Sequence, residues 1–217
     1  GNLCIYDADP FVHLKTVSVH RKGINDLAVH SSGRVALTVG RDSCLGMVNL
    51  VRGRRSFSCR LVKEAEIVRY SDDGEKFFMV SEEKIGVHEA EDAKVVCEIE
   101  GGKRVLCVAV GKSGLLFTGG EDRSITCWDS STGKAAYSVE DAHSTRVKGL
   151  VVFENKHDGQ TSETPNILAS ASSDGVIRIW DIRMIAKEKP SPLSEANTKS
   201  RLTCLAGSSM KRVVLDT

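Results

Sequence analysis

The chain has 217 residues, and 30 Lys and Arg residues balance 29 Asp and Glu residues to a formal net charge of +1. Hydrophobic residues make up 41% and charged residues 27% of the chain, which is ordinary for a globular protein and excludes an intrinsically disordered one. The balanced charge excludes a strongly basic nucleic-acid-binding arm or an acidic tail within these 217 residues, and leaves room for local charged patches. No apolar run approaches the roughly 18–20 residues of a membrane-spanning helix.

Seven cysteines are scattered through the chain, without a Cys-x-x-Cys pair and mostly inside apolar runs such as Val105–Val108. This pattern predicts buried, reduced thiols in an intracellular protein, and no metal site. Nothing in the sequence indicates a cofactor or a small-molecule substrate. The chain begins with Gly1 rather than Met, so we expect it to be a piece of a longer protein.

The strongest signal is an internal repeat, which we follow in chain order. Residues 3–7 match the end of one copy. Four further copies follow, each starting with a short apolar strand and a turn. They begin at Ile24, Ile67, Val105 and Val147, and the copy at Ile67 is the weakest. Residues 201–205 match the start of another copy.

The period of the repeat predicts the architecture. The ends of successive copies at Asn49, His88, Asp129 and Asp181 are 39, 41 and 52 residues apart, and a polar stretch at 154–165 accounts for the longest spacing. A repeat of about 40–45 residues with four short strands is typical of propeller blades. The sequence therefore predicts an all-β propeller, one domain over 1–217, with about four full blades and two partial ones.

The same residues resemble the WD-repeat family, in which Trp-Asp pairs such as Trp128-Asp129 and Trp180-Asp181 end each repeat. The resemblance implies a ring of about seven blades, of which this chain would be a part. It also implies a hydrogen-bonded chain of His, Ser or Thr, Asp and Trp within each blade. The matching residues here are His20, Thr38 and Asp42, with Val48 in place of Trp; Thr118, Asp122 and Trp128, without a His; and the full set of His143, Ser170, Asp174 and Trp180.

Ser170, His143 and Asp174 could be mistaken for a catalytic triad. Because the same residue types recur at the same spacing in several copies, we interpret them as part of the fold and expect no catalytic residues. The other histidines share no spacing, and we expect them on the surface or the rim: His13, His30, His88 and His157.

Arginines have a pattern of their own. Arg104, Arg146 and Arg201 each directly precede the first strand of a copy, and Arg41 precedes the turn residue Asp42. Equivalent loops of a propeller emerge on one face, so these four arginines are candidates for binding RNA phosphate or an acidic peptide. The alternative is that they keep the loops soluble or support a neighbouring blade. A second basic group is expected on an outer, solvated connection: Arg52, Arg54, Arg55 and Arg60.

Two polar segments, 154–165 and 187–197, are predicted to be a loop insertion and a flexible connection.

A narrower resemblance rests on "LVRGRRSF", "AEIVRYSDDGEKFFMVSEEKIGVHEAE", "ILASASSDGVIRIWDIR" and the closing "NTKSRLTCLAG". These segments resemble the family of p21-activated-kinase-interacting proteins, whose fungal counterpart is a maintenance-of-killer protein. The resemblance implies a nuclear, nucleolar scaffold for assembly of the large (60S) ribosomal subunit, with pre-60S ribosomal proteins, assembly factors and rRNA as partners. The alternative that it implies is a signalling adaptor that binds and restrains p21-activated kinase. An enzyme is the third and least favoured hypothesis.

Overall fold

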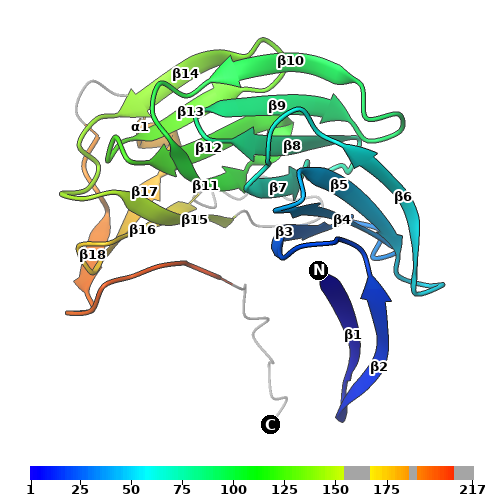
Figure 1. Cartoon of the computed structure of the whole chain (residues 1–217). Coiled ribbons are helices and arrows are strands. Elements are labelled where there is room, and N and C mark those ends of the chain that lie inside the picture. Colours follow the sequence, from blue (N-terminus) through cyan, green and yellow to red (C-terminus); the bar gives the residue numbers. More distant parts are fainter. Residues whose placement is uncertain (154–166, 186–189, 208–217) are drawn as a thin grey trace, which may run out of the picture.

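The computed structural model describes residues 1–153, 167–185 and 190–207. Four antiparallel sheets of four strands each stand side by side in an arc, preceded by a two-stranded hairpin (Figure 1). In each sheet the strands follow one another in chain order from the centre of the arc to its rim. We call the sheets blades I to IV. The arc does not close within the described residues (Figure 1).

The strands divide among the blades as follows. The N-terminal hairpin has β1 (Asn2–Ala8) and β2 (Phe11–Ser18). Blade I has β3 (Ile24–Val29), β4 (Val35–Gly40), β5 (Cys44–Asn49) and β6 (Arg54–Arg60). Blade II has β7 (Ile67–Tyr70), β8 (Lys76–Ser81), β9 (Lys84–Glu89) and β10 (Val95–Glu100). Blade III has β11 (Val105–Val110), β12 (Leu115–Gly120), β13 (Ile125–Asp129) and β14 (Lys134–Val139). Blade IV has β15 (Val147–Phe153), β16 (Ile167–Ser172), β17 (Val176–Asp181) and β18 (Ser194–Asn197).

Only short helical turns interrupt the strands. A 3-10 turn, Lys112–Gly114, joins β11 to β12, and α1 (Ile182–Ile185) follows β17. No helix among the described residues is long and apolar enough to cross a membrane. The all-β propeller prediction is confirmed, with four full blades and one partial blade at the N-terminal end.

The core is divided into layers between neighbouring blades. The second strand of each blade is buried almost throughout. In blades II and III another blade packs on each of its two faces, whereas the N-terminal hairpin packs against blade I and residues near Leu205 lie against blade IV. Alternate side chains of such a strand therefore reach opposite neighbours. In β8, Phe77 packs with residues of blade I, and the adjacent Phe78 packs with residues of blade III. The outer strands are largely exposed and close the rim.

The inner strands carry a repeated irregularity. Strands β3, β11 and β15 each have a bulge at their second residue, at Asn25, Leu106 and Lys148. Strand β7 of blade II pairs regularly, without the bulge. Blade II also differs in its turn, because Ser81 pairs with Lys84 across only two residues.

The structure corrects the register that the sequence suggested for blade II. Lys76 pairs with Glu89, as Val35 pairs with Asn49 and Leu115 with Asp129. Glu89, rather than His88, therefore ends this copy, and the copies ending at Asn49, Glu89 and Asp129 are 40 residues apart. The prediction that His88 lies on the surface is wrong, since it is buried and stacks on Phe77 with ring centroids 4.9 Å apart.

The connection predicted at 187–197 is wrong in its last part. Residues 194–197 form β18, which pairs with β17 through backbone hydrogen bonds although its side chains are exposed. The predicted loop at 154–165 and residues 187–189 lie outside the described residues.

The last predicted copy, at 201–205, forms no strand in the part of the chain that the structure describes. The segment nevertheless lies against the inner strand of blade IV: a Cβ atom on Gly149 would be 2.4 Å from that of Leu205. That is where the inner strand of a following blade would start. That residues 1–217 form a single domain stays a prediction.

Candidate functional site

One face of the arc collects all the loops that lead into the inner strands. Successive antiparallel strands run in opposite directions, so the loop before each inner strand and the turn between the second and third strands lie at the same end of the blade. We call this end the leading face and the opposite end the trailing face. The candidate arginines Arg41, Arg104, Arg146 and Arg201 all belong to loops or turns of the leading face.

Blade IV contains the most complete polar network. The Ser170 hydroxyl accepts a hydrogen bond from Trp180 Nε1 at 2.9 Å and lies 2.7 Å from His143 Nε2. His143 Nδ1 is 3.6 Å from Asp174 Oδ2, which accepts instead from the backbone N–H and hydroxyl of Ser144. Burial lowers the pKa of His143, and the Asp174 carboxylate only partly offsets this effect. The imidazole is therefore held neutral inside the blade.

Blade I has the same network without the Trp. His20 Nδ1 donates to Asp42 Oδ1 at 2.9 Å, and His20 Nε2 lies 2.8 Å from the Thr38 hydroxyl. The other Asp42 oxygen accepts from the backbone N–H of Arg21 at 2.8 Å. Burial raises the pKa of the Asp42 carboxyl, but the hydrogen bonds from Arg21 and His20 bring it below its ordinary value. The network thus ties the loop into β3 to the turn between β4 and β5.

Blades III and II have progressively less of this network. In blade III, Trp128 Nε1 donates to the Thr118 hydroxyl at 2.8 Å, and Asp122 accepts from the backbone N–H of Ser124. In blade II, Met79 and His88 occupy the places of the Ser or Thr and of the Trp. His88 Nδ1 lies 3.2 Å from the Ala93 carbonyl oxygen, outside any such chain. In blades I, III and IV these groups bond one another between strands or between a strand and a loop, so their geometry is that of a fold-stabilising network.

The candidate arginines differ in their surroundings. Arg104 Nη2 is 2.5 Å from Glu66 Oε1, in the loop before blade II. This ion pair joins neighbouring blades, so the geometry of Arg104 matches the alternative of inter-blade support. A similar inter-blade bond that the sequence did not reveal joins Arg69 to Asp26, which also accepts from the backbone N–H of Val68 at 2.9 Å.

Arg146 and Arg201 lie with a third cation, Lys148, where the leading face meets the inner strands. Burial lowers the pKa of Lys148, and the positive charges of Arg146 and Arg201 lower it further. Arg146 and Arg201 are exposed. Lys148 is the bulge residue of β15, a position that the sequence pattern alone did not distinguish as a candidate site.

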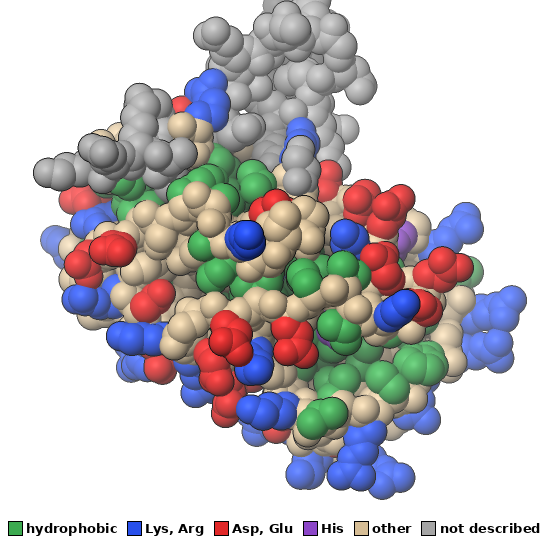
Figure 2. Space-filling model, turned by 90° about the horizontal axis from the view of Figure 1, so that it is seen from above, with side chains coloured by type: hydrophobic (Ala, Val, Ile, Leu, Met, Phe, Trp, Pro, Cys, Tyr) green, Lys and Arg blue, Asp and Glu red, His purple; other side chains and the backbone are tan. Residues whose placement is uncertain are grey.

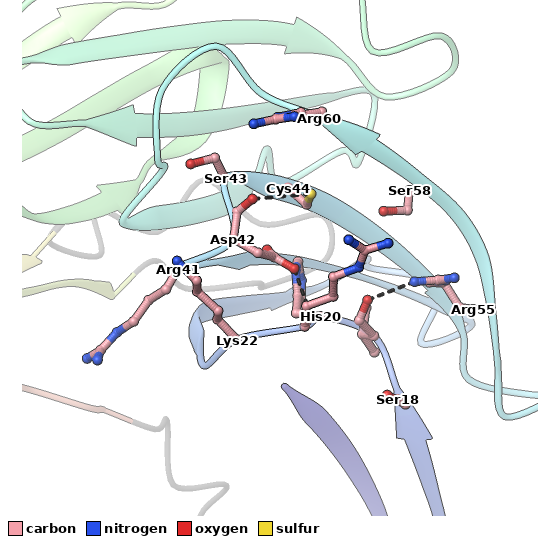
Figure 3. A pocket seen from close by; sticks show the side chains of 12 residues that line it. Ser18, His20, Lys22, Arg41, Asp42, Ser43, Cys44, Arg55, Ser58 and Arg60 are labelled. Atoms are coloured by element: carbon pink, nitrogen blue, oxygen red, sulfur yellow. Dashed lines mark hydrogen bonds and ion pairs between the residues drawn. The ribbon is translucent and has the colours of Figure 1, made fainter.

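Arg41 belongs to a cavity of about 800 Å³ on the leading face beside blade I (Figure 3). Four more basic residues line it: Arg21, Lys22, Arg55 and Arg60. Arg54, Arg55 and Arg60 belong to strand β6, so the prediction that they lie on a connection is wrong, but β6 is the largely exposed outer strand of blade I, as expected for a solvated edge. Arg52 and Arg54 lie at the trailing end of the same blade and do not line the cavity. Sequence reasoning missed Arg21 and Lys22, which directly follow His20.

Elsewhere the charges are mixed. Figure 2, which looks onto the outer rim, shows basic and acidic side chains interspersed among apolar ones. Exposed pairs such as Arg123 with Asp141 and Lys84 with Glu100 compensate one another. In the described ranges, no cluster of His, Cys, Asp and Glu has the geometry to hold a metal ion.

The sequence pattern of the WD40 family, described as WD domain, G-beta repeat, matches residues 11–47, 93–129 and 137–181. The chain belongs to the WD40-repeat family. The residues left unmatched between 47 and 93 hold most of blade II, the blade without the bulge and the polar network.

Curated relatives match most of the chain. A p21-activated protein kinase-interacting protein 1-like from Danio rerio is 34% identical over 205 residues, which are 94% of this chain and 54% of that protein. The human p21-activated protein kinase-interacting protein 1 is 34% identical over 179 residues, 82% of this chain and 44% of that protein. Shk1 kinase-binding protein 15 of Schizosaccharomyces pombe is 29% identical over 171 residues, 78% of this chain and 45% of that protein. The chain thus spans about half the length of the relatives it matches.

These findings confirm the resemblance to the p21-activated-kinase-interacting WD-repeat proteins. Together with the blade architecture, they point to a non-catalytic scaffold for protein–protein interaction.

Proposed function

We propose that this WD40 scaffold binds a p21-activated kinase through its leading face. The observation that carries the proposal is the identity of about one third, over most of this chain, to proteins named for their interaction with that kinase. The face supports it with exposed cations that could meet an acidic surface of a kinase, above all Arg146 and Arg201.

The test is direct binding between the full-length protein and a purified p21-activated kinase. We expect a complex that survives RNase treatment and weakens with rising salt. Arg146→Glu with Arg201→Glu should lower the affinity at least about tenfold, because exposed cations would become repulsive. The matched control is Lys94→Glu with Lys134→Glu, which makes the same charge change at the trailing face. Equal binding by both double variants would refute the use of this face, and no direct complex would refute the kinase as partner.

Assembly of the large ribosomal subunit is the second candidate, together with a nucleolar location. It rests on the resemblance of the closing segment "NTKSRLTCLAG" to the p21-activated-kinase-interacting protein family. The gathering of Arg146, Lys148 and Arg201 supports it, because such a group suits a phosphate backbone. Purification of the full-length protein from cells, with and without RNase, separates the two candidates. Large-subunit precursors in the eluate, without a direct kinase complex, would favour assembly, and imaging of the tagged protein would test the nucleolar location.

A further inference from the structure

The cavity beside blade I is assembled from three separate segments. Residues 18–22 lead from β2 towards β3, residues 41–44 make the turn between β4 and β5, and strand β6 supplies the outer wall. Figure 3 shows Arg55 and Arg60 on one side, Lys22 and Arg41 on the other, and the His20–Asp42 pair between them. The His20–Asp42 hydrogen bond fixes two of the three segments relative to each other. Arg55 fixes the third, since its Nη1 donates to the Val19 carbonyl oxygen at 3.0 Å.

The cavity has an excess of positive charge. Five basic side chains line it, against one carboxylate, that of Asp42. Both Asp42 oxygens already accept hydrogen bonds, from His20 Nδ1 and the Arg21 backbone. Arg21, Lys22, Arg41 and Arg60 are exposed, and none of the four forms an ion pair with another described residue. Arg104 and Arg123, on the same face, each have an acidic partner.

The other lining groups narrow the choice of ligand. Ser18, Ser43 and Ser58 line the cavity with hydroxyl groups that can donate to an anion. Among the described residues that line it, none is Phe, Tyr or Trp, so nothing offers the stacking surface that single-stranded RNA bases use. A phosphate monoester has about twice the charge of a carboxylate and three acceptor oxygens, so it can engage several of these cations together.

We propose that this cavity binds a phosphoserine or phosphothreonine within an extended segment of a partner protein. Arg21, Lys22, Arg41 and Arg60 supply the charge, while Arg55 holds the outer wall in place. This site goes beyond the proposed function, because it makes binding depend on phosphorylation whichever protein the partner is.

The test uses a degenerate library of short peptides centred on phosphoserine or phosphothreonine, together with the same library without phosphate. The full chain is expected to enrich phosphorylated peptides, and the best of these is then measured by fluorescence anisotropy. Lys22→Glu with Arg60→Glu should weaken its binding at least about tenfold. The matched control, Arg52→Glu with Arg54→Glu, reverses two exposed charges at the trailing end of the same blade and should stay within about twofold. Unchanged thermal unfolding of both double variants establishes that they fold.

Three results would overturn the proposal: no preference for the phosphorylated library, equal loss in both double variants, or tighter binding of a single-stranded RNA of equal charge that depends on Lys22 and Arg60. Since the peptides contain no kinase, this test can fail while the kinase complex still forms. Equally, the peptides can bind as expected although no complex with the kinase forms.

Discussion

Removing one hydroxyl group at the centre of blade IV provides a strong test of the polar network. Ser170→Ala deletes the atom that joins Trp180 Nε1 and His143 Nε2, at 2.9 and 2.7 Å. All three side chains are buried, with exposed fractions of 0%, 2% and 1% for Ser170, Trp180 and His143. The space left by an oxygen atom is too small to admit a water molecule that could replace it.

The expected cost follows from the number of groups left without a partner. A buried polar group that loses its hydrogen bond costs about 1–3 kcal/mol, and here two groups lose theirs, so we expect about 3 kcal/mol in the free energy of unfolding. For a chain of this size that lowers the melting temperature by about 6–12 °C. Thr118→Ala in blade III orphans only Trp128 Nε1, so its cost should be about half as large.

Urea unfolding at neutral pH measures both effects, and an unchanged dependence on denaturant ensures that the same transition is compared. Ser170→Thr is the matched control, because blades I and III carry Thr38 and Thr118 at this place. It keeps the hydroxyl and should stay close to the parent protein. If Ser170→Ala unfolds at the same urea concentration as the parent, the argument that this network stabilises the blade is wrong.

Three further predictions concern the rest of the fold. Burial holds the pKa of His143 below its ordinary value of 6.5, so below that pH the unfolded chain takes up a proton that the folded chain does not. The free energy of unfolding should therefore fall as the pH drops below about 6.5. A His143→Gln variant whose stability follows the same pH profile would contradict this. Asp26→Ala removes the acceptor that joins Arg69 of blade II to blade I and that also binds the backbone N–H of Val68. It should lower the free energy of unfolding, measured with a chemical denaturant, by about 1–3 kcal/mol. A change under about 0.5 kcal/mol would show that this bond does not stabilise the fold. A Cβ atom on Gly120 would lie 2.2 Å from the Arg104 carbonyl oxygen. Gly120→Ala should therefore cost about 1–3 kcal/mol of stability and lower the melting temperature by several degrees. An unshifted melting curve would exclude that close contact.

The features that were predictable from sequence are those that recur. The spacing of small residues and the turn Asp located blades I, III and IV, and a Trp marked blades III and IV, because the same strands and turns need the same residues in each. Blade II has neither the Asp nor the Trp, so its register was off by one residue at His88. Strand β18 was missed because Ser, Glu, Ala and Asn have little preference for strands, and it forms through backbone pairing with β17.

The candidate site residues also divide into those that recur in the sequence and those that only the folded structure brings together. The polar networks recur from blade to blade, so their members could be proposed from the repeat spacing together with the resemblance to the WD-repeat family. The partner of Arg104 lies 38 residues away in another loop, and no local pattern indicates such a pairing. The basic cavity joins residues 21–22, Arg41 and strand β6 only after the blade has folded. The sequence therefore does not show which cations have an acidic partner, because these pairings form only when the blades pack together.

Within its own sheet, blade II depends more on apolar packing than its neighbours do. It lacks the polar network and the bulge, and its buried side chains include Phe77, Phe78 and Met79. Apolar packing loses strength on cooling, because its driving force near room temperature is the entropy of water. The middle of the arc should therefore be its cold-sensitive part. On cooling, blade II should loosen before blade IV, the reverse of fraying from the ends of the arc.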